Sequence, residues 1–294
     1  MKIKEQEYLE NYDITKYERP SIATDMVVFT IVEDKEESNY RKLSDKHLKV
    51  LMIQRGQPPF QNMWALPGGF CKSTETVYEA AKRELKEETN ADRAHLELCG
   101  VFSDQGRDPR GWIISQAFMA LINNEVVRVR AGGDAWEAKW FRVSLKKIQE
   151  TSEKGENGGS CINTYRLELN CDEICLWAVV SEELLYEDYH ASVEYKLIDS
   201  EGIGFDHGKI ITYVLKKLRD KVEEDGKIVF DLLPEVFTLS DLQKAFEIIL
   251  DKPFLSPNFR RKISKYVIET EHTLTGGGHR PAKLFRRNVE EFYR

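Results

Sequence analysis

The sequence predicts an α+β protein in which a domain with a mixed sheet and helices precedes a C-terminal winged helix-turn-helix domain. Three observations support this fold class. Strand-like segments surround a glycine turn and a carboxylate-rich helix between residues 20 and 145, residues 164–199 alternate as strands do, and residues 238–287 read as helix, helix and hairpin. A chain of 294 residues also has room for two domains.

The composition indicates a folded chain outside the membrane. Hydrophobic residues form 41% and charged residues 32% of the sequence, which suffices for a packed core. No apolar run approaches the roughly 18 residues that a membrane span needs, and the N-terminus is charged where a signal peptide is apolar. The five cysteines lack zinc-site spacing, so we expect reduced thiols. We expect a soluble, cytoplasmic protein that does not associate with membranes.

The first domain reads as strands around one helix. A Pro-Gly-Gly turn precedes residues 74–90, where Val77, Ala80, Ala81 and Leu85 recur at helical spacing. Strands rich in β-branched and aromatic residues are expected at 21–32, 48–54, 96–102, 112–122 and 138–143.

A Gly/Ser/Glu-rich break at residues 151–160 predicts the end of this pattern. The strand-like stretch that follows predicts a small β meander, and residues 205–222 predict an amphipathic helix. We place the first domain at residues 1–202, with a β-rich insertion at about 151–200, and the winged-helix domain at 203–294.

The C-terminal segment predicts the winged helix in detail. Thr238 or Ser240 can cap a helix through Leu250, and Ser256 before Pro257 is a favourable N-cap and first-turn pair for a second helix, 258–266. VIETEHTL and AKLFRR then flank the turn Gly276-Gly277-Gly278 as the two strands of a hairpin.

Charge divides the chain along its length. The net charge is −7, yet residues 252–294 carry +6, which leaves −13 on residues 1–251. A basic C-terminal block is the footprint of a nucleic-acid contact, and an ordinary solvated face is the alternative. The candidate DNA-binding side chains are those of the second helix and of the hairpin tip: Arg260, Arg261, Lys262, Lys265, His279, Arg280 and Lys283. A basic helix on a dimerisation domain remains open.

Three carboxylates share one face of the helix at 74–90. At about 100° per residue, Glu87 and Glu88 fall on either side of Glu84, one turn further along. Like charges at this spacing repel unless cations neutralise them, and oxygen ligands of this kind suit Mg²⁺ or Mn²⁺. Such a metal would polarise a phosphate oxygen and lower the pKa of bound water, the two tasks of pyrophosphate hydrolysis. Arg83 can hold a neighbouring carboxylate in place.

From Gly69 the sequence resembles the signature of the Nudix hydrolases, G-x5-E-x7-R-E-U-x-E-E-x-G-U, in which U is aliphatic. Type and spacing match at Gly69, Glu75, Arg83, Glu84, Leu85, Glu87 and Glu88. Ala91 takes the last position, and Asn90 replaces a glycine, which Asn does with little strain at a helix end. The resemblance implies a Nudix α/β/α sandwich with a mixed sheet, catalysis through Arg83 and the three glutamates, and Glu84, Glu87 and Glu88 as metal ligands, assisted by a carbonyl of Gly68 or Gly69.

The substrate must be chosen outside this signature. Arg107 and Arg110 surround a turn and suit bidentate binding of phosphate, or form an internal ion pair of Arg107 with Asp108. SDQGRDPRG and AGGDAWEAKWF resemble the subfamily that acts on or senses ADP-ribose, in which an acidic residue near Asp134 or Glu137 activates water or completes the metal shell. We favour Glu137 as this base. Trp64, Phe102 and Trp112 are candidates for stacking on adenine.

Residues 203–287 resemble the Nudix-related transcriptional regulators, which join an ADP-ribose-sensing Nudix domain to a winged helix. Two functions are therefore expected: a Mg²⁺- or Mn²⁺-dependent hydrolase that splits ADP-ribose or a related nucleotide into AMP and a sugar phosphate, and, as the alternative, an ADP-ribose-sensing regulator with weak or no turnover. Both bring a double-stranded DNA operator and a homodimer as expected partners.

Overall fold

A large mixed sheet organises the first part of the chain in the computed structural model, which describes residues 2–33, 46–91, 94–123, 135–155, 158–187, 190–274 and 281–292. Its strand order is β10-β9-β8-β7-β2-β1-β6-β5, with short strands β3 and β4 added to β2 and β1. β1 and β6 run parallel, and the other neighbours run antiparallel. Asp134, His279, Arg280 and the turn at Gly276, Gly277 and Gly278 lie outside the described residues.

The strands of the first half lie close to the predicted positions. Their bounds are β1 Ser21–Glu33, β2 Lys46–Arg55, β3 Trp64–Ala65, β4 Gly68–Phe70, β5 His95–Phe102 and β6 Ile113–Leu121. Met26, Val27, Val28 and Phe29 of β1 are all fully buried, as expected of a central strand covered on both faces.

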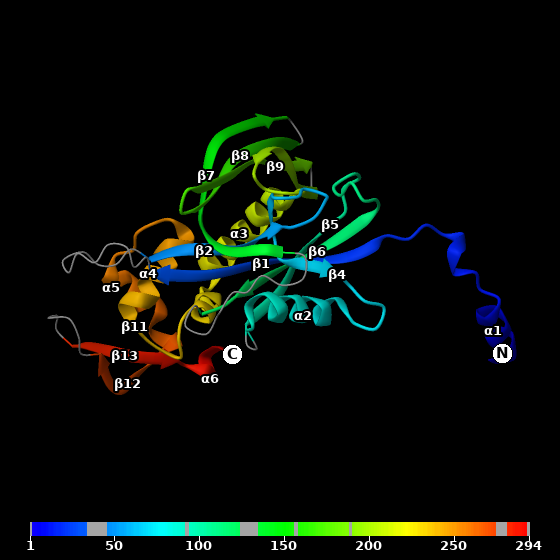
Figure 1. Cartoon of the computed structure of the whole chain (residues 1–294). Coiled ribbons are helices and arrows are strands. Elements are labelled where there is room, and N and C mark those ends of the chain that lie inside the picture. Colours follow the sequence, from blue (N-terminus) through cyan, green and yellow to red (C-terminus); the bar gives the residue numbers. More distant parts are fainter. Residues whose placement is uncertain are drawn as a thin grey trace.

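Helices cover both faces of this sheet (Figure 1). α2 (Val77–Thr89) packs Ala81 and Leu85 into a cluster with Met26 and Phe118. α3 (His207–Glu224) buries the predicted stripe of Ile210, Ile211, Val214, Leu215 and Leu218 against the other face. The result is the expected α/β/α sandwich with a mixed sheet.

Helix α2 begins three residues later than predicted, and its ends explain its bounds. Thr76 is the N-cap and forms a capping box with Glu79, so the helix starts at Val77. At the other end Asn90 adopts the left-handed conformation, with φ 54°, and donates its N–H to the Lys86 carbonyl. Asn90 therefore performs the helix-ending role of the glycine that it replaces.

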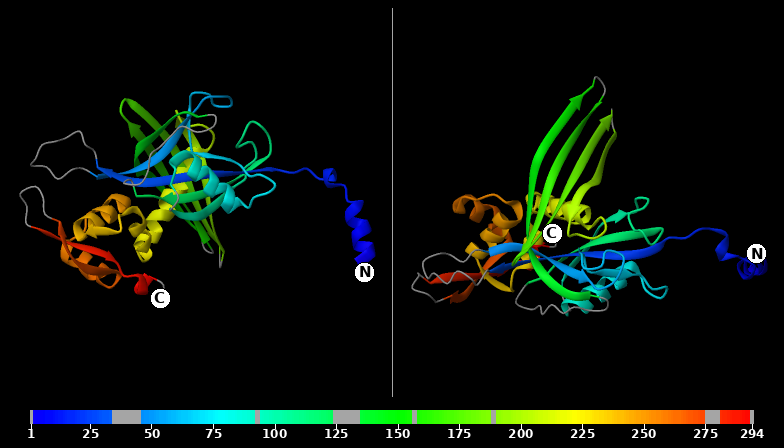
Figure 2. Two further views of the ribbon diagram at one scale, coloured as in Figure 1. Left: turned by 60° about the horizontal axis from the view of Figure 1, so that its bottom comes forward. Right: turned by 45° about the horizontal axis from the view of Figure 1, so that its top comes forward.

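The break predicted at residues 151–160 is a hairpin turn and not the end of the domain pattern. β7 (Ala135–Lys154) runs straight through Thr151, and β8 (Gly158–Cys171) returns beside it. The predicted meander then follows as β9 (Ile174–Glu187) and β10 (His190–Glu201). These four strands continue the central sheet, and the ends that meet at the turn after β7 project beyond its helices (Figure 2, right).

The C-terminal part has the predicted order of helix, helix and hairpin. Its elements are η3 Lys227–Leu232, β11 Val236–Thr238, α4 Leu239–Leu250, α5 Ser256–Ile263, η4 Ser264–Tyr266, β12 Val267–Leu274, β13 Ala282–Arg287 and α6 Val289–Phe292. β11 was not predicted; it pairs with β13 and completes a three-stranded sheet.

Two details of the predicted helices are corrected. Thr238, not Ser240, caps α4, through a capping box with Asp241. Ser256 is already the first helical residue, and Leu255, whose backbone is extended, is the N-cap of α5. The helix itself ends at Ile263, and a 3-10 turn continues to Tyr266.

Helix α3 connects the two parts of the chain. It packs on strands β8, β9 and β10 and also contacts α4 and η3. Arg219 near its end donates from Nε to the Ile249 carbonyl at 2.8 Å. At the opposite end of the molecule, α1 (Lys2–Glu10) and η1 (Ile14–Lys16) extend away from the sheet (Figure 1). Among the helices that the structure describes, none is long and apolar enough to cross a membrane.

Candidate functional site

A cavity of about 270 Å³ lies between α2 and the start of α3. One wall carries the glycine turn and the glutamates of α2, and the opposite wall carries Phe205 and His207. The remaining walls come from β1, β2, β6 and the loop after β5: Ala23, Asp25, Arg55, Arg107, Asp108, Arg110 and Ser115. Segments far apart in the sequence thus enclose one cavity.

The structure brings the three predicted carboxylates of α2 to this cavity. Glu84 and Glu88 are 8% and 7% exposed, whereas the Glu87 side chain is 55% exposed. Burial raises the pKa of Glu84, and the hydrogen bond and charge of Arg83 oppose that rise. A bound cation would stabilise the ionised form of a buried carboxylate such as Glu84, because the cation offsets the cost of burying a negative charge.

Arg83 lies between the carboxylates of the signature. Its Nε and NH2 donate to Glu75 at 3.1 and 2.8 Å, and its NH1 donates to Glu84 Oε1 at 2.6 Å. The hydrogen bonds from Arg83 lower the pKa of Glu75 to about 2. Arg83 therefore fixes the position of Glu84 and does not itself line the cavity.

The glycine turn allows a close approach of backbone and carboxylate. A Cβ atom at Gly69 would lie 2.2 Å from Glu84 Oε1, and one at Gly68 would lie 2.1 Å from the Thr24 carbonyl oxygen. The donor set of carboxylate and carbonyl oxygens fits Mg²⁺ or Mn²⁺ in chemical type. Across the described ranges, no three acidic, His or Cys side chains converge into a closed metal site. Mg²⁺ commonly binds through one or two carboxylates and completes its shell with water and substrate phosphate, so this open arrangement is compatible with it.

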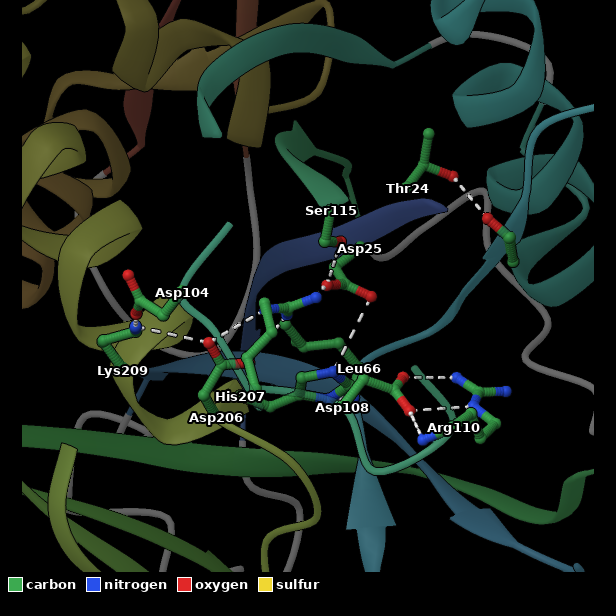
Figure 3. Close-up of polar contacts among 12 residues, drawn as sticks. Thr24, Asp25, Leu66, Asp104, Asp108, Arg110, Ser115, Asp206, His207 and Lys209 are labelled. Carbon is green, nitrogen blue, oxygen red and sulfur yellow. Dashed lines mark hydrogen bonds and ion pairs between the residues drawn. The ribbon is translucent and has the colours of Figure 1, made fainter. Parts of the chain in front are cut away.

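A buried polar network forms the opposite end of the cavity (Figure 3). His207 Nδ1 accepts the backbone N–H of Leu66 at 2.8 Å, and His207 Nε2 lies 3.6 Å from Asp25 Oδ1. Burial lowers the pKa of His207, and Asp25 opposes the shift. A neutral ring with its proton on Nε2, facing Asp25, satisfies this geometry. Ser115 Oγ also donates to Asp25.

Arg107 belongs to this network. Its Nε and NH2 donate to the two carboxylate oxygens of Asp206 at 3.1 and 2.7 Å, and NH2 lies 3.5 Å from Asp25 Oδ2. The Arg107 side chain is only 5% exposed. The ion pair considered for Arg107 and Asp108 is formed instead by Arg110, whose guanidinium donates two hydrogen bonds of 3.0 and 2.7 Å to Asp108 (Figure 3).

Aromatic rings and guanidinium groups meet at the rim. The Phe205 ring has Arg55 at 5.0 Å and Arg110 at 5.5 Å from its centroid, and Arg110 also lies 5.1 Å from the centroid of Phe70. Phe205 stacks on His207 with 5.1 Å between ring centroids. Such rings offer flat surfaces for a nucleobase, and the adjacent guanidinium groups suit phosphate.

Several predicted residues lie outside the cavity. Glu137 sits on β7 and pairs with Lys139 at 3.1 Å, away from the residues that line the cavity. Trp64 is buried against Phe141, while Phe102 packs on Tyr213 and Trp112 is 53% exposed. The base role of Glu137 thus remains a prediction.

Sequence reasoning missed Asp25, Arg55 and Ser115 of the strands and, at the start of α3, Phe205, Asp206 and His207. The last three could have been found. They stand in GFDHGK, directly before the amphipathic stripe of α3, and that segment was assigned to the other domain. The sequence did contain a local signal. An aromatic, an acidic and a histidine residue stand together where a loop meets the start of a helix, and such residues in a loop often have a functional role.

The second helix of the winged-helix segment presents a basic surface. Phe259 and Ile263 anchor α5 in the core, and Arg260, Arg261 and Lys262 are exposed beside them. Within the part of the chain that the structure covers, these three form no ion pair. Lys265 follows in η4 with its amine 4.7 Å from the Tyr266 ring centroid.

Two basic side chains of the described hairpin strands are held in ion pairs. Lys283 on β13 pairs with Glu269 on β12 at 2.5 Å. Arg287 pairs with Asp231 at 2.8 Å and therefore joins the hairpin to η3. Of the predicted DNA-binding residues that the structure describes, those of α5 are the best placed to meet a phosphate backbone.

Known proteins resemble both parts of the chain. Residues 41–156 match the NUDIX domain, and residues 229–287 match the NrtR DNA-binding winged helix domain. A protein of Acinetobacter baylyi named ADPR responsive transcriptional repressor NtrR is 26% identical over 291 residues, which are 98% of this chain and 90% of that protein.

Two further relatives extend the likeness. An ADP-ribose pyrophosphatase of Methanocaldococcus jannaschii is 44% identical over 112 residues, covering 37% of this chain and 64% of that protein. The crystal structure of a MutT/nudix family protein from Enterococcus faecalis superposes with a TM-score of 0.66 at 26% identity, covering 97% of this chain and 93% of that one. The chain therefore contains a Nudix domain joined to a DNA-binding winged-helix domain of the NrtR type.

Proposed function

We propose that the Nudix cavity binds ADP-ribose or a related nucleoside diphosphate derivative and, with Mg²⁺ or Mn²⁺, hydrolyses its pyrophosphate to AMP and a sugar phosphate. The observation that carries this proposal is that Glu84, Glu87 and Glu88 line the same cavity as Arg107 and Arg110. Oxygen donors for a divalent cation and donors for phosphate oxygens thus face one space.

The residues of the chain divide this work. Glu84, Glu87 and Glu88, with a carbonyl of Gly68 or Gly69, would hold the cation, which when bound supplies charge for the phosphate oxygens and acidifies a water. Arg83 keeps Glu84 in its ligating position. Arg110, in contact with the rings of Phe70 and Phe205, is placed to bind a phosphate beside a stacked base. Glu137 is retained as a candidate base.

A second function, a DNA-binding regulator that responds to the nucleotide, is favoured by a different observation. Phe205 and His207 line the cavity at the start of α3, and Arg219 near the end of α3 binds the Ile249 carbonyl of α4. Helix α3 therefore links the cavity to the winged helix. A ligand that shifts the start of α3 can change the position of α4 through this one helix. The Acinetobacter relative, by its name, is such an ADP-ribose-responsive repressor.

One experiment tests both functions on the same preparation. AMP release from ADP-ribose is measured with Mg²⁺ for the natural protein and for Glu84→Gln, and binding to a duplex operator is measured with and without ADP-ribose. Metal-dependent release that the variant lacks establishes the hydrolase. No release, together with DNA binding that changes with ADP-ribose, establishes a sensor and refutes the enzymatic proposal.

We also propose that the protein acts as a homodimer. Winged helices of regulators commonly meet palindromic operators as pairs, with half-sites about one helical turn apart. Analytical ultracentrifugation with and without operator DNA tests this, and a monomer bound to a single half-site would contradict it.

A further inference from the structure

A second cavity, of about 510 Å³, lies between the sheet and the winged-helix segment. Its walls come from the start of β2, the middle of β7, the end of α4 with the residues after it, and one residue of α3. None of the residues that line the Nudix cavity lines this one. It is therefore a separate space, and the proposed hydrolysis gives it no role.

This second cavity is strongly cationic. Its lining includes six permanent cations against two carboxylates, Glu247 and Asp251. The cations are Lys46, Arg142, Lys146, Arg219, Lys244 and Lys252. A concave surface with this excess of one sign concentrates ions of the opposite sign.

Only part of that charge is compensated by the protein itself. Lys46 pairs with Asp241 at 2.6 Å, and Lys252 pairs with Glu223 at 2.5 Å. Arg142, Lys146 and Lys244 form no ion pair with any residue in the described ranges. Three cations from two different elements, β7 and α4, therefore face one cavity with their charge available to a ligand.

Arg219 contributes a wall of the second cavity that favours an anion. Its guanidinium donates to the Ile249 carbonyl at 2.8 Å and to the Leu145 carbonyl at 3.4 Å, so it covers oxygens that would repel an anion. Burial lowers the pKa of Arg219, and the charge of the exposed Asp251 opposes that shift. Glu247 is engaged as well, because its Oε1 accepts from Gln243 and from the Phe254 N–H, both at 2.9 Å.

We propose that this cavity binds a small phosphate-bearing anion, through Arg142, Lys146 and Lys244, and that the anion bridges the sheet to α4. Lysine and arginine side chains are the common partners of phosphate oxygens. The concave shape, enclosed between β7 and α4, favours a small ligand over a duplex.

The test uses inorganic triphosphate as the probe and the full chain as the sample. Binding is followed by isothermal titration calorimetry in EDTA, so that no metal can carry the probe to the carboxylates of α2. The natural protein should bind one equivalent. Arg142→Gln with Lys244→Gln should weaken binding by about tenfold or more, because two charge-assisted hydrogen bonds to the phosphate oxygens are lost.

Two matched variants control for charge and folding. Lys16→Gln with Lys154→Gln removes the same charge at exposed positions remote from this cavity and should bind triphosphate as the natural protein does. Arg142→Lys with Lys244→Arg keeps the charge and should retain binding. Equal losses in the two Gln double variants would mean a diffuse charge effect and would overturn the proposal.

Competition identifies the source of the phosphate. Triphosphate binding should persist at saturating ADP-ribose; displacement by ADP-ribose would place the probe in the Nudix cavity and overturn the proposal. If duplex DNA displaces triphosphate and the Gln double variant loses DNA affinity in parallel, the surface is a DNA backbone contact, and the proposal of a small-anion site is wrong. Absence of binding to the natural protein is equally contrary to it.

Discussion

The Arg107 guanidinium donates to both carboxylate oxygens of Asp206, at 2.7 and 3.1 Å, although 99 positions separate the two residues. This buried pair joins the loop after β5 to the residue directly before α3. Burial alone would raise the pKa of Asp206, but the hydrogen bonds and charge of Arg107 lower it below its usual value. The Arg107 pair thus joins the loop that forms one wall of the Nudix cavity to α3, the helix that contacts the winged-helix segment.

Asp206→Asn should therefore destabilise the protein, by about 3–5 kcal/mol, because it leaves the charge of Arg107 buried without its main partner. The free energy of unfolding in urea measures this loss. The control is Glu150→Gln, which breaks the exposed pair of Lys147 and Glu150 and should cost at most about 1 kcal/mol. Equal losses in the two variants would contradict a structural role for the Arg107 pair.

Glu84→Gln and Glu88→Gln should each lower the metal-dependent kcat by about a hundredfold or more, since a bound divalent cation contributes several kcal/mol to the transition state. Steady-state AMP release with Mg²⁺ and with Mn²⁺ measures the change. Glu79→Gln on the same helix is the control, because its side chain caps Thr76 and Gln keeps that hydrogen bond. Unchanged rates in both cavity variants would remove Glu84 and Glu88 from the metal site.

Stability should depend on pH through His95, which joins β5 to η3. Its Nδ1 lies 3.1 Å from Asp231 Oδ2, and the hydrogen bond to Asp231 raises the pKa of His95 above 6.5, against the effect of burial. A pKa raised in the folded state means that the stabilisation is complete below 6.5 and is lost as the pH rises through the folded pKa.

The stability difference between the natural protein and His95→Gln should accordingly be largest in mildly acidic solution and should shrink at alkaline pH. Urea unfolding across that pH range, with an NMR titration of the His95 ring, measures it. A difference that does not change with pH would show that the His95 charge contributes nothing to the contact.

Arg260→Ala with Arg261→Ala should weaken DNA binding and make it less dependent on salt. Each phosphate contact contributes about 0.9 to the slope of log affinity against log salt concentration, so the loss of two contacts should lower the slope by nearly 2. Gel-shift titrations over a range of salt concentrations provide the slope. Lys16→Ala with Lys154→Ala removes the same charge elsewhere and should leave the slope unchanged; an unaltered shift for the Arg260 and Arg261 variant would exclude α5 as the DNA-binding helix.

The sequence predicted those parts of the molecule that local chemistry determines. Glu84, Glu87 and Glu88 follow helical spacing, and Asn90 follows the rule for a helix end, so both were predicted without knowledge of the fold. The segment at 151–160 was misread because glycine, serine and glutamate are typical of a linker and of a hairpin turn alike. Only the pairing of β7 with β8 decides between them.

Long-range packing accounts for what the sequence did not predict at the site. His207 reaches the cavity because it binds the N–H of Leu66, 141 positions earlier, and Arg107 takes Asp206 rather than its neighbour Asp108. No local pattern records such partners. The sequence analysis expected Glu137 near the metal because it assigned Glu137 to a loop. In the structure β7 begins at Ala135, so Glu137 is part of the sheet.

The two glycines of the turn should respond differently to the same substitution. A Cβ atom at Gly69 would meet the tip of Glu84, which can rotate away, so Gly69→Ala should remove metal-dependent turnover while the unfolding free energy stays nearly constant. At Gly68 the same atom would lie 2.1 Å from the Thr24 carbonyl, which is backbone of a central strand and cannot yield. Gly68→Ala should thus cost about 1–3 kcal/mol of stability. Urea unfolding and AMP release, measured on both variants, separate the two effects; a Gly69→Ala protein with natural turnover would show that Glu84 does not need its position beside the turn.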